Sequence, residues 1–130
     1  MEKKILVVDD DAMNLRMAEF ILNKNGYSVT KAESAKIALE MLREHEFALI
    51  LLDIEMPEMN GFELMQVLLE DEGLKKTPVI FLTADRSAET EEKCFQLGAE
   101  DYIGKPFIPE VMMHRVKRTL ELDEYRKKYS

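Results

Sequence analysis

Hydrophobic and polar positions alternate in blocks along the chain, and the blocks predict strands and helices in turn. Apolar runs at residues 5–8, 47–52 and 79–82 are continuous, as in strands covered on both faces of a parallel sheet. Shorter runs at residues 27–32 and 101–103 predict two further strands. Strands that alternate with helices predict an α/β fold, a doubly wound five-stranded parallel sheet with right-handed crossovers.

The segments between these runs carry apolar residues at helical spacing, each on one face that we expect to pack on the sheet. Asp11 and Ser34 are placed to cap two of the helices. The helix at residues 87–97 begins with almost no apolar residue, so we expect it to be weakly anchored and easy to reposition. The other predicted faces are Leu15, Ala18 and Leu22; Ala35, Ala38 and Leu42; Leu64, Val67 and Leu68; and Val111, Met112, Val116 and Leu120.

Composition narrows the class of protein. The 130 residues suit one domain, and no apolar run approaches the ~20 residues of a membrane span. The formal net charge of −8 disfavours non-specific binding to nucleic acid or to an anionic membrane. The single cysteine, Cys94, and a start without signal-peptide features predict a cytoplasmic protein. We expect Cys94 to be a small buried hydrophobe.

Chemistry-bearing residues gather at the predicted strand ends. Carboxyl ends of parallel strands meet at one edge of a sheet, where such folds bind ligands. The residues at these ends are Asp9, Asp10, Asp53, Thr83 and Lys105. Three close carboxylates repel one another by roughly 4 kcal/mol per pair at an effective dielectric constant near 20. Lys105 and a hard divalent cation would balance them, and Mg²⁺ takes carboxylates, water and phosphate oxygens as ligands.

Four motifs resemble those of receiver domains in two-component response regulators, including the chemotaxis regulators. They are VVDDD at residues 7–11, DIEMPEMNG at 53–61, TA at 83–84 and KPF at 105–107. The resemblance extends to about residue 120. It implies a flavodoxin-like sheet with strand order 2-1-3-4-5, flanked by five helices.

By this resemblance, Asp53 accepts a phosphoryl group from a sensor histidine kinase or a histidine phosphotransfer protein. Asp10 and Asp53 would bind Mg²⁺ together with the backbone carbonyl of Glu55, and Asp9 would help through a water molecule. Lys105 would pair with a phosphoryl oxygen, and its peptide bond to the following proline can be cis in such proteins. The implied function is a phosphorylation-activated signalling switch rather than an enzyme.

The resemblance also implies how the switch works. Thr83 would turn its hydroxyl onto the phosphoryl group, and Tyr102 would turn inward behind it. The signal would then pass through the surface formed by the helix at residues 87–97, the strand at 101–103 and the last helix. Slow self-dephosphorylation would be tuned by Glu55 and Asp85, which could equally be solvated loop acids.

The end of the chain leaves two interpretations open. We divide the sequence into a receiver domain at residues 1–120 and a helical extension at 121–130. Leu122, Tyr125 and Tyr129 form an apolar stripe on this extension. It could lead to an absent output domain or an effector, or support a phosphorylation-dependent homodimer, or be a fraying helix end.

Two other functions compete with the receiver hypothesis. A small Mg²⁺-dependent phosphatase would use a nucleophile in the Asp9-x-Asp11 motif, but it leaves the motif around Asp53 unexplained. An unphosphorylated scaffold would not need the complete set of site residues. His45 and His114 have no spaced partner and are expected to be solvated rather than metal ligands.

Overall fold

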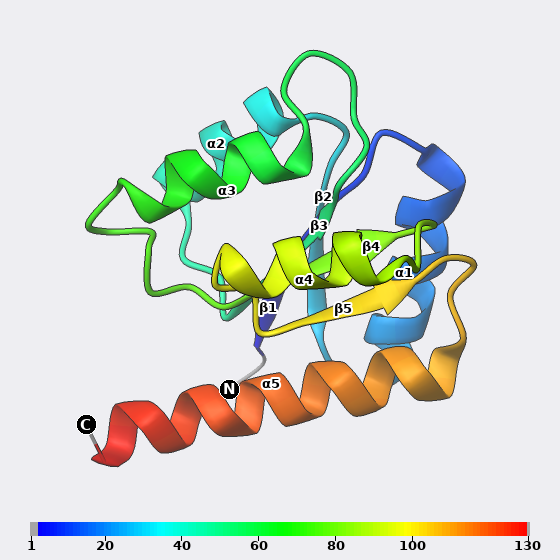
Figure 1. Cartoon of the computed structure of the whole chain (residues 1–130). Helices are drawn as coiled ribbons and strands as arrows, with labels where there is room; N and C mark the ends of the chain where they lie inside the picture. The colour runs from blue at the N-terminus through cyan, green and yellow to red at the C-terminus, as the bar shows by residue number, and fades with distance from the viewer. Residues whose placement is uncertain (1–2, 130) are drawn as a thin grey trace.

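The computed structural model describes residues 3–129 and shows a doubly wound α/β fold (Figure 1). Its sheet has the strand order β2-β1-β3-β4-β5, with every neighbouring pair parallel, as predicted. The strands are β1 (Lys4–Val8), β2 (Ser28–Ala32), β3 (Leu49–Asp53), β4 (Val79–Thr83) and β5 (Asp101–Gly104). Within residues 3–129, no helix is both long enough and apolar enough to cross a membrane.

Helices cover both faces of the sheet. They are α1 (Ala12–Lys24), α2 (Ala35–Glu44), α3 (Gly61–Leu69), α4 (Ala88–Gln96) and α5 (Pro109–Tyr129). Side chains of β1 alternate between the faces: Ile5 and Val7 pack with α1 and α5, whereas Leu6 and Val8 pack with α2, α3 and α4. The continuous apolar runs therefore reflect burial on two sides, as the sequence predicted.

The helix starts follow the predicted capping. The Asp11 side chain accepts a hydrogen bond from the Met13 amide at the start of α1, and the Ser34 side chain accepts from Ile37 at the start of α2. These bonds satisfy amides that have no partner within the helix. Asp11 thereby fixes where α1 begins, directly after the acidic segment that follows β1.

Some predicted details are wrong. β3 begins at Leu49, two residues after the predicted start, because the preceding residues form the connection from α2. In α3 the buried stripe includes Met65, and Val67 lies at its partly exposed edge. In α5 Met113 is buried while Val111 is 37% exposed, so the inward face is rotated from the predicted one. Short runs of mixed apolar residues leave this rotation undetermined until the helix packs.

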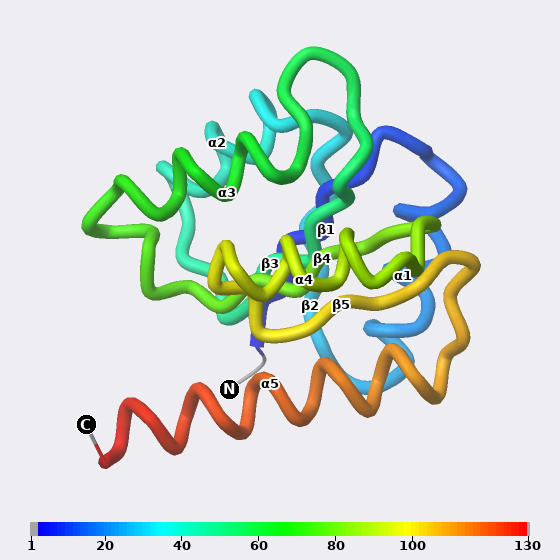
Figure 2. Tube along the Cα trace, viewed as in Figure 1, coloured from blue at the N-terminus to red at the C-terminus, as the bar shows by residue number. Residues whose placement is uncertain are grey.

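α5 continues past residue 120 without interruption, and its carboxyl-terminal end reaches beyond the sheet (Figure 2). Ion pairs from Lys3 to Glu124 and from Arg126 to Glu100 tie this part of the helix to the domain. On it, Leu122, Tyr125 and Tyr129 are all exposed. α5 is helical through Tyr129, and residue 130 of the predicted extension lies outside the described residues.

Candidate functional site

The three central strands bring the predicted residues to one edge of the sheet. Val8 lies beside Leu52 in the parallel register, so Asp9 follows β1 next to Asp53, the last residue of β3. Asp9 and Asp53 are 0% and 3% exposed, and Thr83 at the end of β4 is equally buried. Asp10, by contrast, is exposed at the mouth of the site. The hydrophobic core fixes the strands, and the strands in turn fix the positions of these buried polar side chains.

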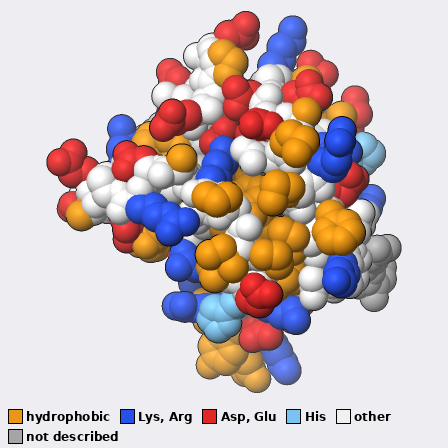
Figure 3. Space-filling model, turned by 90° about the vertical axis from the view of Figure 1, so that its right-hand side faces the viewer, with side chains coloured by type: hydrophobic (Ala, Val, Ile, Leu, Met, Phe, Trp, Pro, Cys, Tyr) orange, Lys and Arg blue, Asp and Glu red, His pale blue; other side chains and the backbone are white. Residues whose placement is uncertain are grey.

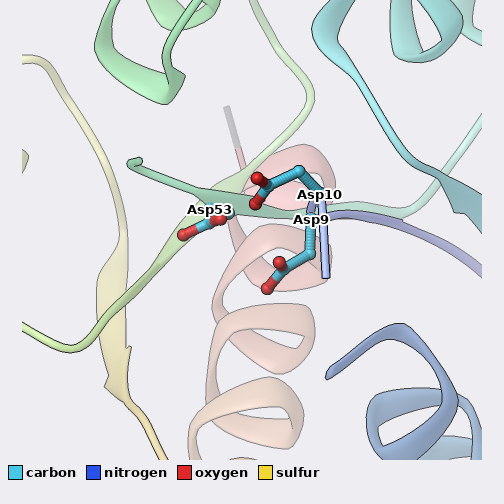
Figure 4. A group of neighbouring side chains, drawn as sticks. All are labelled: Asp9, Asp10 and Asp53. Carbon is cyan, nitrogen blue, oxygen red and sulfur yellow. The ribbon is translucent and has the colours of Figure 1, made fainter. Parts of the chain in front are cut away.

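Three carboxylates meet at this edge. Carboxylate oxygens of Asp9, Asp10 and Asp53 all lie within 4.8 Å of one another, and Figure 4 shows the three side chains gathered together. The Lys105 ammonium joins them, with Nζ 2.8 Å from Asp53 Oδ1 and 2.9 Å from Asp9 Oδ2. The peptide bond between Lys105 and Pro106 is cis. The structure therefore brings together the acids and the cation that the sequence placed at separate strand ends.

Burial and neighbouring charges shift the pKa values of Asp53 and Lys105. Burial raises the pKa of Asp53 to about 7, and the nearby Asp9 carboxylate adds to the rise while Lys105 opposes it. Burial would lower the pKa of Lys105, but its contacts with Asp53 and Asp9 outweigh that effect and raise the pKa. A single ammonium therefore does not fully compensate the acids, and the pocket favours a further positive charge.

One buried oxygen in the pocket has no hydrogen-bond partner within residues 3–129. Among the described residues, Asp9 Oδ2 is the one buried side-chain oxygen that accepts no hydrogen bond. Lys105 Nζ lies near it without hydrogen-bonding geometry, so the contact is electrostatic only. The surrounding pocket of about 250 Å³ is also lined by Glu55 and Asn14. A pocket with several carboxylates, one of which has an unsatisfied oxygen, is suited to a hard divalent cation such as Mg²⁺.

Gly61 supports the site in a way that the sequence analysis missed. A Cβ atom at Gly61 would lie 2.2 Å from the backbone oxygen of Asp53, far inside van der Waals contact. The Gly61 amide donates to the Ile54 carbonyl at 2.8 Å, which fixes α3 against the end of β3. Only glycine permits this approach. Gly61 ends the motif at residues 53–61, but nothing in the local sequence pattern indicates contact with the Asp53 backbone.

The Thr83 hydroxyl lines the pocket but is bonded away from it. It donates to the backbone carbonyl of Asp85 at 3.0 Å and accepts from the Asp85 amide at 2.9 Å. Asp85 itself is not among the residues lining the pocket. Its carboxylate instead accepts hydrogen bonds from the Ser87 amide and the Thr90 hydroxyl at the start of α4.

Tyr102 lies outside the acidic pocket, and its ring packs between side chains of α4 and α5. The Arg115 guanidinium lies 4.9 Å from the centre of its ring, and the Phe95 ring meets it edge-on at 6.0 Å. The neighbouring Glu91 carboxylate raises the pKa of the Tyr102 phenol. Arg115 also donates to the Tyr102 backbone carbonyl. Tyr102 therefore connects β5 to both neighbouring helices.

The remaining candidates form no second reactive site. His45 caps the end of α2 at the opposite edge of the sheet, and His114 is exposed on α5. Cys94 is fully buried on α4, and burial raises the pKa of its thiol to about 11. A thiol so far from ionisation is unreactive, which agrees with the prediction of a small buried hydrophobe.

Fold and site together define a doubly wound α/β protein with an acidic pocket, which could hold a metal ion, at the carboxyl ends of β1 and β3. The sequence model of the response regulator receiver domain matches residues 5–117. The chain belongs to this family, whose members are phosphoacceptor switches of two-component systems. The acidic cluster fits such a phosphorylation site and its Mg²⁺ ion.

Individual relatives agree with this assignment. The polar-differentiation response regulator DivK of Brucella ovis is 38% identical over 82% of this chain and 86% of its own length. Histidine kinase 2 of Arabidopsis thaliana is 40% identical over 92% of this chain, which spans only 12% of that protein. The structure of the chemotaxis protein CheY4 of Vibrio cholerae superposes with a TM-score of 0.86 at 31% identity, covering 92% of this chain and 99% of its own.

Proposed function

We propose that Asp53 is the phosphoacceptor, and that it takes its phosphoryl group from a phosphohistidine of a sensor kinase or phosphotransfer protein. The observation that carries this proposal is the buried Asp53 carboxylate at a strand end, with Lys105 on Oδ1 and two further acids beside it. Asp53 is the one member of the acidic cluster that is both buried and paired with Lys105 through a hydrogen bond.

The transfer needs an in-line nucleophile and compensation of the phosphoryl charge. Oδ1 of Asp53 is bonded to Lys105, so Oδ2 attacks phosphorus while the bond from phosphorus to the donor nitrogen breaks. A carboxylate needs no general base for this attack. Lys105 stays within reach of the incoming phosphoryl oxygens and stabilises their charge.

The cation is held by residues of the same pocket. Asp10 and Asp53 would bind Mg²⁺ directly with the Glu55 backbone carbonyl, and Asp9 would act through a water molecule. When bound there, Mg²⁺ would supply positive charge to the phosphoryl oxygens and would favour the ionised form of Asp53 despite its raised pKa. The unsatisfied Asp9 oxygen supports this arrangement.

The switch connects the pocket to the outer surface of α4, β5 and α5. The Thr83 hydroxyl leaves its bonds to Asp85 and donates to a phosphoryl oxygen. Tyr102 then gives up its outward contacts with Glu91 and Phe95 and turns inward. Phosphorylation therefore shifts a population between two arrangements of this surface, on which an effector or output domain would bind.

A second surface suits the phosphodonor protein. Along α1 the hydrophobic side chains of Met13, Met17 and Phe20 are exposed, Phe20 by 68%. Figure 3 shows hydrophobic side chains gathered on this side of the molecule, with acidic side chains above them. α1 also supplies Asn14 to the wall of the acidic pocket. A phosphodonor protein bound on α1 would therefore lie next to Asp53. We propose a cytoplasmic location for the chain, where it could meet such a donor.

The acyl phosphate would be lost slowly by attack of water beside Asp53. Glu55, which lines the pocket and is exposed, is placed to influence that water. The domain proper would comprise residues 1–120, and the exposed stripe of the extension would contact an output domain or a second copy of the chain. These roles follow from the same pocket and the same continuous α5.

Intact-mass measurement tests the phosphoacceptor role. The chain is incubated with Mg²⁺ and acetyl phosphate, and we expect a single phosphoryl adduct. Asp53→Asn should give none, because an amide cannot form the acyl phosphate. An equal adduct on the variant would refute the proposal.

A thermal-melt titration tests the metal site. Mg²⁺ should raise the melting temperature, since a ligand bound only by the folded state stabilises it. Asp10→Asn should abolish the rise. The matched control is Asp71→Asn, a substitution in the loop after α3, which should leave the rise intact.

A further inference from the structure

Asp85 makes two sets of hydrogen bonds that point in opposite directions. Its backbone amide and carbonyl both bond to the Thr83 hydroxyl, at 2.9 and 3.0 Å. Its carboxylate bonds to α4, with Oδ1 accepting from the Ser87 amide at 2.9 Å and Oδ2 from the Thr90 hydroxyl at 2.7 Å. One residue therefore links the pocket hydroxyl to the first turn of α4.

α4 has little else to hold it in place. Cys94 is its one fully buried side chain. Ser87 caps the helix by accepting from the Thr90 amide, and that bond is long at 3.3 Å. Because apolar burial is so limited, the polar contacts at its amino-terminal end contribute a large share of what fixes its position.

We propose that Asp85 is a positioning residue that couples the Thr83 hydroxyl to the first turn of α4. The inference deepens the proposed function and rests on it, because it specifies how the Thr83 movement reaches the output surface. It differs from a role for Asp85 in tuning the attacking water. Both carboxylate oxygens are already bonded to α4, and Asp85 does not line the acidic pocket.

The sequence of events follows from the bonds. When the Thr83 hydroxyl donates to a phosphoryl oxygen, it can no longer donate to the Asp85 carbonyl. The loop from residue 84 to 87 is then released from the end of β4. The Asp85 carboxylate keeps its hydrogen bonds to Ser87 and Thr90, so movement of the loop also moves the first turn of α4. The hydrogen bonds from Ser87 and Thr90 lower the pKa of Asp85, so they persist at neutral pH.

Two variants remove the hydrogen bond between Asp85 and Thr90, one by changing the acceptor and the other by changing the donor. Asp85→Ala deletes the acceptor, and Thr90→Val deletes the donor hydroxyl while keeping the shape of the side chain. Hydrogen–deuterium exchange of the amides at residues 88–96 should rise in both resting proteins by about threefold to tenfold, the range expected for a lost helix cap. Asp85→Asn, which preserves an acceptor for the Ser87 amide, should restore part of the protection.

Thr83→Val distinguishes the coupling from simple capping of α4 by Asp85. If Asp85 only capped the helix, this substitution would leave amide exchange at residues 88–96 unchanged. It removes the hydroxyl two residues before Asp85 without touching α4, and the coupling predicts faster exchange at residues 88–96. The matched control is Glu89→Ala, because Glu89 is an exposed acid in the same turn of α4. That control should leave exchange unchanged.

The phosphoryl lifetime, followed by intact mass, separates the two roles of Asp85. Under the coupling, Asp85→Ala and Thr90→Val change the lifetime in the same direction. Thr90→Val has the smaller effect because it leaves the Ser87 bond in place, and the double variant adds nothing to Asp85→Ala. A lifetime changed by Asp85→Ala alone, or exchange at residues 88–96 unaffected by Thr83→Val, would overturn the coupling. Failure of Asp53 to form any adduct would instead refute the proposed function, while the exchange measured on resting protein would still test the coupling.

Discussion

The two ends of the signalling path are held in different ways. At the acidic pocket, Asp9, Asp53 and Thr83 are buried at the ends of strands whose side chains are covered on both faces. α4, some residues further along the chain, buries only Cys94 fully and relies on contacts at the molecular surface. The pocket is therefore set by the hydrophobic core, whereas the position of α4 depends on a few polar and aromatic contacts.

This difference suits a switch. A phosphoacceptor must be held in one geometry, because small displacements of reacting groups are costly. An element that reports phosphorylation must instead be movable by the free energy that one new group supplies. The contacts of α4 with Tyr102 and the Asp85 loop are each weak enough to be exchanged for others.

The cost of burying the ionised Asp53 carboxylate in the acidic pocket can be measured by varying the pH. Burial raises the pKa of Asp53 to about 7, above its value in the unfolded chain, so the folded state binds the proton more tightly. The free energy of unfolding therefore loses this contribution as pH rises from 4 through 7. Asp53→Asn cannot titrate, and in EDTA its stability relative to the native chain should grow over that range by up to about 4 kcal/mol.

Urea denaturation at several pH values measures this difference between the two proteins. Comparing them cancels the titration of groups that do not interact with Asp53, so the difference reports on Asp53 together with its partners Asp9 and Lys105. A stability difference that does not change from pH 4 to 8 would contradict the raised pKa of Asp53.

Gly61→Ala should damage the rigid end through the backbone. The added Cβ would meet the Asp53 carbonyl oxygen, so either α3 or the end of β3 must shift, at a cost of about 3 kcal/mol. We expect a lower denaturation midpoint in urea and slower phosphorylation of Asp53. Gly73→Ala is the matched control, because its Cβ would meet only the Asp71 side chain at 3.3 Å. Equal effects of the two substitutions would show that Gly61 supports nothing at the site.

Lys93→Ala should have the smallest effect and should be confined to α4. The Lys93 ammonium lies 4.7 Å from the centre of the Phe62 ring on α3, and such a contact contributes about 0.5 kcal/mol at the surface. Exchange at residues 88–96 should increase slightly while global stability barely changes. Lys36→Ala, at an exposed position of α2, provides the comparison. A global loss as large as that of Gly61→Ala would mean that α4 is part of the rigid core.

The rigid end was largely predictable from the sequence, and so was the weak anchoring of α4, whereas the contacts that position α4 were not. Continuous apolar runs ending in Asp9, Asp53 and Thr83 indicate a parallel sheet and the edge where these residues meet. The close approach of Gly61 was not predictable, because it depends on how α3 packs against β3. The bonds of Asp85 and the packing of Tyr102 likewise depend on side-chain geometry that no spacing encodes.

Mapping the modified residue tests the central claim most directly. The protein is phosphorylated with acetyl phosphate and Mg²⁺, the acyl phosphate is reduced with borohydride, and the digested peptides are sequenced by mass spectrometry. The account predicts reduction at Asp53 alone. Modification at Asp9 or Asp11, as a phosphatase with its nucleophile after β1 would show, would contradict it.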